Sequence, residues 1–316
     1  MVTRISIATF NLLNLSAVGQ TTYNRARPIE QDVFEKKIAW IADQLKELKA
    51  DLYGFQEVWS REALVACFRA AGLEDDYVIV ARDAIPGRVQ TAAAIRKRYR
   101  ILNDPSSHWI EAFPPEAKLI KRPPKPGEPL NTMELRIDQF SRPVLNLELR
   151  IDAQIRLRFF VIHLKSKLGM ELDKEEASDP AIKAHEKALG EALSAIRRTA
   201  EVAALRVWLN KELRDTKTPV AVVGDLNDGH LSTTAAILSA QPPVKLFEAS
   251  TIGNEPTKAG DIGLYSAQML QEYRSIRDVY YTYDHQNILE SLDHIFVSRS
   301  FISIRRTRYG RSAICA

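Results

Sequence analysis

The sequence predicts a single α/β domain spanning residues 1–316, and two observations carry this prediction. Short runs rich in β-branched residues, typical of buried strands, alternate along the chain with segments whose apolar residues recur every three or four positions, as in amphipathic helices. Neither an internal repeat nor an interdomain linker interrupts this alternation. A chain of 316 residues is also long enough to bury a substantial core.

The composition is that of an ordinary globular protein, with 45% apolar and 27% charged residues. No apolar run reaches the length of a membrane span, and the N-terminal residues alternate like a strand instead of forming a signal peptide. The two cysteines, Cys67 and Cys315, lie far apart and show neither a disulfide framework nor metal-ligand spacing. We therefore expect a reducing, cytoplasmic compartment.

The net charge of +4 is unevenly distributed. Residues 299–316 contain five arginines and no acidic residue, and a second basic region runs through residues 96–100 and 118–125. Basic clusters of this kind can bind a polyanion such as nucleic acid, or they can simply be solvated surface. The charge pattern alone leaves both alternatives open.

The first half of the chain predicts strands and helices in alternation, followed by loops. Ser60 is the expected N-cap of its second helix. Residues 105–129 contain Pro-Pro and Pro-Gly pairs, which predict irregular structure. The predicted elements are a strand over 5–10, a helix with an apolar stripe at Phe34, Ile38, Ile41, Leu45 and Leu48, a strand over 51–58, a helix over 61–71, and strands over 77–81 and 91–95.

The second half predicts a hairpin, a long helix and further strands. Asp179-Pro180 is a typical N-cap and first helical residue. The predicted elements are strands over 141–149 and 157–164, a helix from Pro180 to Leu213 with an apolar face of Leu189, Leu193, Ile196, Ala200, Ala203 and Val207, a buried strand over 219–223, a short helix over 233–238, and strands over 275–283 and 292–298.

Polar residues recur at one structural position, the end of a predicted strand. The apolar run Val220–Val223 leads through Gly224 to Asp225 and Asn227, and the other members of the set are Asn11, Glu57, His163 and Asp293. Three carboxylates gathered beside a core repel one another unless a cation neutralises them. Oxygen-rich ligands suit Mg²⁺, with Mn²⁺ as a substitute. Asp293 and His294 alternate along their strand, so only one can face such a site, and we expect it to be Asp293.

Five short blocks in this order resemble the endonuclease/exonuclease/phosphatase superfamily, which includes deoxyribonuclease I and the abasic-site endonucleases. They are residues 8–11, 54–58, 160–163, 224–227 and 292–296, and together they extend over nearly the whole chain. The resemblance implies a four-layer α/β/β/α sandwich of two packed mixed sheets flanked by helices. It also implies an active site at one end of the sheets.

The resemblance implies a Mg²⁺-dependent phosphodiester hydrolase, most simply an endo- or exonuclease whose partner is nucleic acid or another phosphodiester. The alternatives are a phosphatase or lipid-headgroup phosphodiesterase of the same superfamily, and a catalytically inactive polyanion- or protein-binding member. By the same resemblance, Glu57 is the principal Mg²⁺ ligand, with Asn11 beside it as a ligand or an orienting amide. Asp225 positions or deprotonates the attacking water, and Asn227 holds a phosphate oxygen.

The remaining roles concern the phosphate and the leaving group. His163 would contact the phosphate or help to protonate the leaving oxygen, and Arg142 resembles a phosphate-contacting arginine of the superfamily. Lys165, two residues after His163, is a further expected phosphate contact. Asp293 would orient a second catalytic histidine.

The sequence departs from the superfamily pattern at two places. Leu13 stands where members with an Asn-x-Asp first motif have a carboxylate. The chain also shows no Ser-Asp-His block of the kind that superfamily members carry on their last strand, so we expect that strand to be missing and a sheet edge to be open. The explanation we prefer is that this sequence lacks its natural C-terminal segment. The alternatives are a degenerate member of the superfamily and substitution of the missing histidine by His285 or His294.

Overall fold

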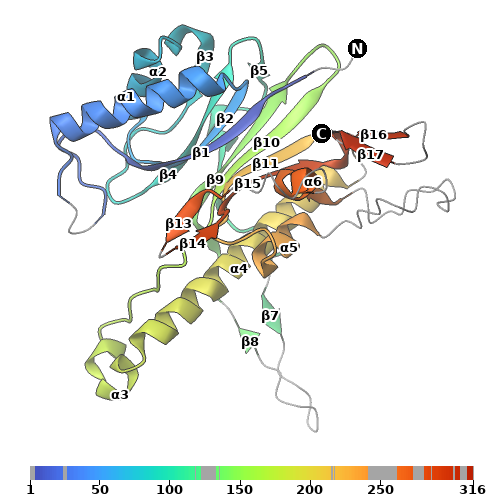
Figure 1. Cartoon of the computed structure of the whole chain (residues 1–316). Coiled ribbons are helices and arrows are strands. Elements are labelled where there is room, and N and C mark those ends of the chain that lie inside the picture. The colour runs from blue at the N-terminus through green and yellow to red at the C-terminus, as the bar shows by residue number, and fades with distance from the viewer. Residues whose placement is uncertain are drawn as a thin grey trace, which may run out of the picture.

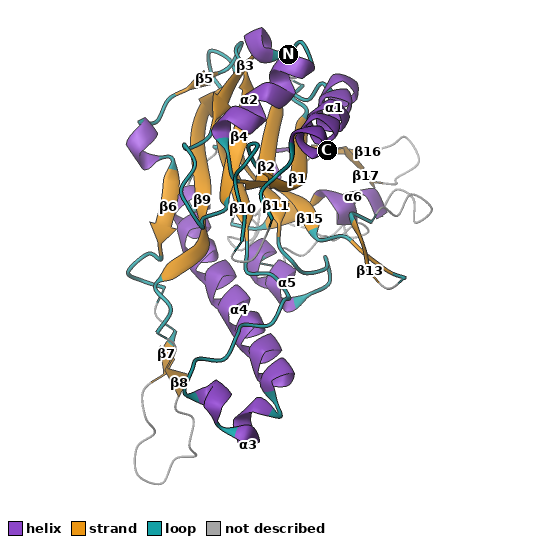
Figure 2. Cartoon of the chain, turned by 90° about the vertical axis from the view of Figure 1, so that its left-hand side faces the viewer, coloured by secondary structure: helices purple, strands orange, loops and turns teal. Residues whose placement is uncertain are grey.

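The computed structural model of the chain describes residues 4–23, 27–117, 119–121, 133–134, 136–214, 216, 218–240, 262–272, 281–285, 287–301, 303–306 and 312–315. Its main body consists of four layers, with helices on the outside and two sheets packed face to face between them (Figure 1). The same layers are visible after a quarter turn (Figure 2). The predicted α/β/β/α sandwich is therefore confirmed.

The first sheet and its helices come from the N-terminal part of the chain. The sheet has the order β1-β2-β4-β3, in which β1 and β2 are parallel and the other pairs are antiparallel. Its elements are β1 (Ile7–Leu15), α1 (Gln31–Leu48), β2 (Leu52–Val58), α2 (Arg61–Ala70), β3 (Tyr77–Val80) and β4 (Gln90–Arg96).

The second sheet has the order β12-β15-β11-β10-β9-β5, with β6 also paired to β9. Only β10 and β11 run parallel, so this sheet is also mixed. Its elements are β5 (Arg100–Ile101), β6 (Trp109–Ala112), β9 (Gln139–Arg150), β10 (Arg156–His163), β11 (Val220–Asp225), β12 (Leu264–Ser266) and β15 (Asp293–Ser298), covered by α4 (Glu186–Leu213) and α5 (Thr233–Ser239).

Short elements surround this body. They are α3 (Pro180–Lys183), α6 (Ala267–Glu272) and three two-stranded hairpins: β7 (Ile120–Lys121) with β8 (Met133–Glu134), β13 (Tyr283–His285) with β14 (Ile288–Glu290), and β16 (Ser303–Arg306) with β17 (Ser312–Cys315). None of the helices in the described part of the chain is long and apolar enough to cross a membrane.

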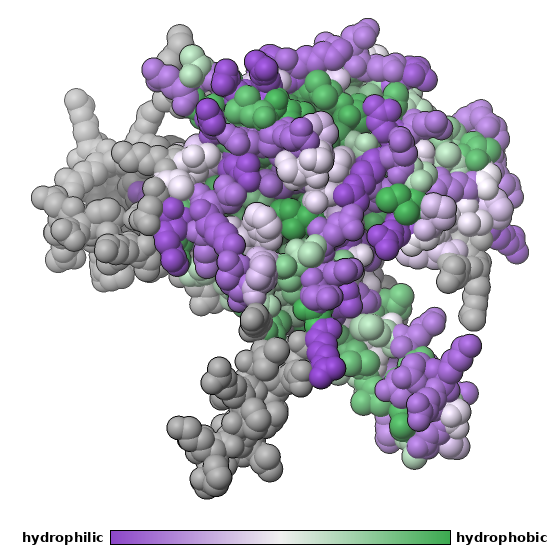
Figure 3. Space-filling model, turned by 180° about the vertical axis from the view of Figure 1, so that it is seen from behind, coloured by the Kyte–Doolittle hydropathy of each residue, from purple (hydrophilic) through white to green (hydrophobic). Residues whose placement is uncertain are grey.

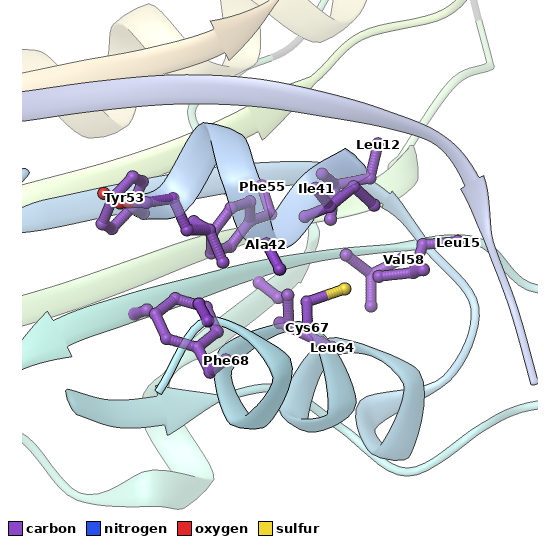
Figure 4. Close-up of a cluster of buried hydrophobic side chains, with 14 of the residues drawn as sticks. Leu12, Leu15, Ile41, Ala42, Tyr53, Phe55, Val58, Leu64, Cys67 and Phe68 are labelled. Atoms are coloured by element: carbon purple, nitrogen blue, oxygen red, sulfur yellow. Dashed lines mark hydrogen bonds between the residues drawn. The ribbon is translucent and has the colours of Figure 1, made fainter. Parts of the chain in front are cut away.

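Apolar side chains fill each of the three interfaces between layers. The outer interface joins α1 and α2 to the first sheet, where Phe55 stacks on Tyr53 with ring centroids 5.6 Å apart and Phe68 meets both edge-on (Figure 4). Ser60 caps α2 as predicted, because its side chain accepts a hydrogen bond from the Ala63 N–H. Burial of these large side chains, at about 1.5–3 kcal/mol each, provides the main force that holds the layers together.

Gly54 marks the closest approach of the two sheets. A Cβ atom at this position would lie 2.4 Å from one methyl group of Val223 and 3.0 Å from one of Val161, both in the second sheet. We therefore expect Gly54→Ala to lower the free energy of unfolding by about 1–3 kcal/mol, the usual cost of overpacking a core. Urea titration should show this, whereas Gly229→Ala, whose Cβ would meet only the end of Glu290 at 4.0 Å, should be near neutral.

The long helix is oriented differently from the prediction. It is interrupted between α3 and α4, and Leu189, Leu193 and Ile196, predicted to be buried, are between 40% and 42% exposed. This first half of α4 projects from the body, and hydrophobic residues interrupt the polar surface around the projection (Figures 1 and 3). Ser194 and Arg198 are buried in their place, so apolar periodicity gave the wrong face for this first half, whereas Ala200 is buried as predicted.

Two other predictions change in the structure. The Pro-rich region contains the strand β6, whose buried Ile110 pairs with Val144 of β9, so regular structure fits between the prolines. The predicted strand over 275–283 lies largely outside the described residues, and Tyr283 begins the β13–β14 hairpin.

The basic cluster at residues 96–100 lies at the opposite end of the sheet from Glu57. Arg96 and Arg98 form ion pairs with Asp51 at 3.5 Å and 2.6 Å, just before β2 begins, whereas Glu57 lies near the end of β2. These arginines therefore stabilise the far end of the strands. The side chains of the other basic stretches, 118–125 and most of 299–316, lie outside the described residues.

Candidate active site

Three of the predicted residues form one row across the second sheet. Asp225 at the end of β11 is the register partner of His163 in β10 and of Asp293 in β15. Asp225 and His163 are the last residues of their strands, whereas Asp293 is the first residue of the antiparallel β15, and the register brings the three side by side. The His163 Nε2 lies 3.6 Å from the Asp225 Oδ2.

Two further predicted residues, Asn11 and Glu57, come from the first sheet. Asn11 in β1 pairs with Gln56 in β2, and the register between these strands shifts immediately beyond that pair. Glu57 follows with a φ of 58°, and Asn227, after β11, has a φ of 53°. Non-glycine residues rarely adopt this left-handed conformation, and such strain concentrates at functional sites.

A single side chain connects the two sheets at this point. The Nδ2 of Asn11 donates a hydrogen bond to Glu57 Oε1 at 3.3 Å and another to Asp225 Oδ2 at 3.1 Å, while its Oδ1 accepts one from the Leu13 N–H at 3.0 Å. The amide therefore lies between the two carboxylates and keeps them apart. The side chain of Leu13 itself is exposed and lines the cleft described below.

Asp225 and Asp293 are crowded carboxylates. Burial, followed by the charge of Asp293, raises the pKa of Asp225 to about 7, although hydrogen bonds from the Asn227 N–H (2.6 Å) and from Asn11 oppose the shift. Burial also raises the pKa of Asp293, helped by the charge of Glu57. Asp225 is therefore basic enough to accept a proton near neutral pH.

These shifts make metal-free stability depend on pH. An acid whose pKa is higher in the folded state holds its proton while the unfolded chain has lost it, so stability falls as pH rises from about 4 to about 7. Asp225→Asn removes this contribution. In EDTA, we expect the free energy of unfolding of the variant, relative to that of the wild-type protein, to increase as the pH rises through this range. Urea titration at each pH measures the difference. A difference that is constant with pH would contradict the raised pKa.

An open cleft of about 980 Å³ lies against these groups. Five consecutive residues of β1, Thr9–Leu13, line it, so the cleft runs along the edge of that strand. Among the described residues, β1 pairs only with β2, which leaves this edge open. The polar residues in the lining are Thr9, Asn11, Glu57, Asp225, Asn227, Asp293, Lys36, Lys37, Ser166, Lys167, Thr282 and Tyr283.

Arg142 and His163 lie behind the carboxylates and are not part of the cleft lining. The Nη1 of Arg142 donates to the Leu164 carbonyl at 2.8 Å, and Asn227 Nδ2 donates to the same carbonyl at 3.0 Å. Burial, followed by the charge of Arg142, lowers the pKa of His163 well below its usual value. His163 is therefore neutral in the metal-free protein.

Lys165 and His294 turn towards protein groups. The Lys165 Nζ donates to the Leu168 carbonyl at 3.0 Å and to the Ser166 hydroxyl at 3.3 Å. The His294 Nε2 lies 2.9 Å from the Asp228 carbonyl oxygen, and His294 does not line the cleft, whereas Asp293 does. The side chain of His285 lies outside the described residues.

Two residues near the site were absent from the sequence-based set. Tyr23 packs edge-on against Trp59, with centroids 4.9 Å apart; burial, followed by the charge of Glu57, raises its pKa, and Arg142 opposes that rise. Lys37 lines the cleft, donates to the Leu13 carbonyl, and has its pKa lowered by burial against an opposing effect of Glu57. Tyr23 lies in a loop and Lys37 on a helix, so neither had the strand-end signal.

The donor set suits a hard cation that retains water. Among the described residues, no three Asp, Glu, His or Cys side chains converge as a complete metal cage. Mg²⁺ rarely needs one, because it binds through one or two carboxylates plus water and substrate phosphate. Asp293 Oδ1 is buried without a hydrogen-bond partner, which is an unsatisfied oxygen of the kind that a cation or its water would satisfy. Glu57, Asp293 and Asn11 could hold such an ion.

Comparisons with known structures support the same fold. TDP2 from Caenorhabditis elegans superposes with a TM-score of 0.52 at 12% identity, covering 98% of this chain and 73% of that one. A mannosyl-6-phosphatase from Bacteroides thetaiotaomicron gives 0.50 at 13% identity, covering 98% and 94%. A search of curated proteins found no match. A model of the Endonuclease/Exonuclease/phosphatase family, whose members hydrolyse phosphate esters, matches residues 8–313, and the chain therefore belongs to this family.

Proposed function

We propose that the protein is a Mg²⁺-dependent phosphodiester hydrolase that cleaves nucleic acid. The observation that carries this proposal is the hydrogen bond from Asn11 to Asp225, which joins the carboxylate of one sheet to those of the other at the wall of an open cleft. Family membership supplies the reaction class, and the substrate and the metal are our proposal.

The proposed role of each residue follows from its surroundings in the site. Asp225, with its raised pKa, accepts a proton from the attacking water, and Asn11 and the Asn227 N–H hold the carboxylate in place. Glu57 holds Mg²⁺, which when bound polarises the phosphate. Arg142 lies outside the cleft lining, and from behind the carboxylates its positive charge offsets the negative charge that develops on the phosphate oxygens.

The shape of the cleft favours a polymeric or aromatic substrate over a small phosphate ester. Trp40 of α1 lines the cleft, is 56% exposed, and rests edge-on against Phe10 with centroids 5.8 Å apart. An exposed indole supported from behind can stack on a nucleobase, a contact worth about 1–3 kcal/mol per base. Lys36 and Lys37 on the same helix suit the phosphates on either side.

The test is incubation of the protein with plasmid DNA, single-stranded DNA and RNA, with Mg²⁺ or with EDTA. We expect cleavage with Mg²⁺ only. Parallel assays with bis-(p-nitrophenyl) phosphate and p-nitrophenyl phosphate separate a diesterase from a phosphomonoesterase. Turnover of the monoester alone would replace the nuclease proposal with a phosphatase. Salt-sensitive nucleic-acid binding without turnover under any metal would replace it with a binding module.

A further inference from the structure

A polar stripe near the middle of α4 faces the loop after β10 and the adjoining end of β9. Ser194, Arg198 and Glu201, spaced four and three residues apart, are buried, while Leu189, Leu193 and Ile196 are 40–42% exposed. Helices normally place the apolar stripe inside. A helix that buries polar side chains and exposes apolar ones loses stability unless other contacts compensate. Such departures from the usual pattern concentrate at functional sites.

The compensating contacts are hydrogen bonds to the loop that directly follows His163. The Ser194 hydroxyl donates to the Leu168 carbonyl at 2.7 Å. Arg198 Nη1 donates to the carbonyls of Lys165 at 3.2 Å and Ser166 at 3.4 Å. The Lys165 N–H donates to Glu201 Oε2 at 2.8 Å. The polar stripe therefore holds residues 165–168 through their backbone.

Glu201 also reaches β9, the neighbouring strand. Its Oε1 accepts hydrogen bonds from the Ser141 N–H at 2.8 Å and from the Ser141 hydroxyl, and Arg197 Nε lies 3.3 Å away. The β9–β10 ladder ends where Leu145 pairs with Val161, and continuing its register would place Ser141 opposite Lys165. The carboxylate thus bridges the two strands where their own pairing has stopped.

We propose that Glu201 is the positioning residue for phosphate recognition. By binding the backbone amides of Ser141 and Lys165, it fixes the separation of β9 from β10 and so places the Arg142 guanidinium beside His163. This proposal rests on the proposed function, because a substrate phosphate is the group that Arg142 meets. The Nε of Arg142 is buried without a hydrogen-bond partner, an unsatisfied donor of the kind that marks a functional site.

Glu201→Gln tests the proposal because it keeps the side chain's size but leaves a single acceptor oxygen for two backbone amides. We expect the KM for a cleaved substrate to rise about tenfold and the affinity for inorganic phosphate, measured calorimetrically, to fall by a similar factor, because misplaced binding groups lose such factors. Glu201→Asp keeps the charge but has a shorter side chain, so its KM and phosphate affinity should lie between those of the wild-type protein and those of Glu201→Gln. Glu212→Gln, on the same helix but paired with Arg158, should change neither quantity.

The alternative, a purely structural role, gives a different result. It lowers the melting temperature and the active fraction but leaves KM and phosphate affinity unchanged, and that outcome overturns the proposal. If Glu201→Gln fails to fold, Ser141→Ala removes one donor to the same carboxylate and should weaken phosphate binding in the same direction. If the wild-type protein hydrolyses nothing, the proposed function fails, while phosphate affinity still decides the role of Glu201. Wild-type protein that cleaves nucleic acid but binds no phosphate overturns the role of Glu201 and leaves the proposed function standing.

Discussion

Asp225→Asn is expected to lower the rate of phosphodiester hydrolysis by about 10²–10⁴-fold, the usual contribution of a positioned general base. The substitution keeps the shape of the side chain and an oxygen that can accept from the Asn227 N–H, but it removes the group that takes the proton. Rates should be measured with saturating Mg²⁺ at pH 8, where the wild-type carboxylate is ionised.

The same variant should be no less stable than the wild-type protein in EDTA at pH 8. Asp225 is then ionised in a buried position, and both burial and the neighbouring Asp293 disfavour its charge, so neutralising Asp225 relieves an unfavourable contact. Asp43→Asn, on the exposed surface of α1, provides the matched control and should alter neither activity nor stability. An Asp225→Asn protein that is folded and fully active would remove Asp225 from the mechanism.

Glu57→Gln is expected to weaken Mg²⁺ binding by at least about 100-fold, the upper end of the cost of losing an outer partner of a metal site. Glu57 lines the cleft, and its strained backbone and its hydrogen bond from Asn11 direct the carboxylate towards Asp225. Gln retains the shape but loses the charge that a hard cation requires. Calorimetric titration with Mg²⁺ and the shift of the melting temperature with Mg²⁺ both report the effect without relying on turnover.

Glu62→Gln, on an exposed position of α2 five residues further along, is the control and should bind Mg²⁺ as the wild-type protein does. Hydrolysis by Glu57→Gln should be lost at ordinary Mg²⁺ concentrations and should partly return at high concentrations. Wild-type affinity in Glu57→Gln would place the ion elsewhere in the cleft, with Asp293 as the next candidate.

Much of the fold could be predicted because it depends on local pattern. Alternating buried strands and amphipathic helices gave the layers, and the five sequence blocks gave the family, and both are confirmed. The strand ends also indicated which residues would meet, because the ends of neighbouring strands share one edge of a sheet. The register of Asp225 with His163 and Asp293 is consistent with that reasoning, while the roles of these residues stay predictions.

The rest depended on contacts between distant segments. Apolar periodicity placed Leu189, Leu193 and Ile196 inside, whereas hydrogen bonds from the loop after β10 require the polar stripe there. Tyr23 and Lys37 come close to Glu57 only through the path of a loop and the position of α1. No local pattern in the sequence marks a residue whose importance comes from a neighbour in another layer.

The hydrogen bond from Asn11 to Asp225 spans 214 residues of sequence and connects groups carried by different sheets. A partly folded chain that has formed only one sheet therefore holds only part of the donor set. Even two intact sheets that slide or separate at Gly54 lose the constellation. Catalytic competence thus becomes a property of the docked pair, and it should disappear cooperatively with the packing between the sheets before either sheet itself unravels.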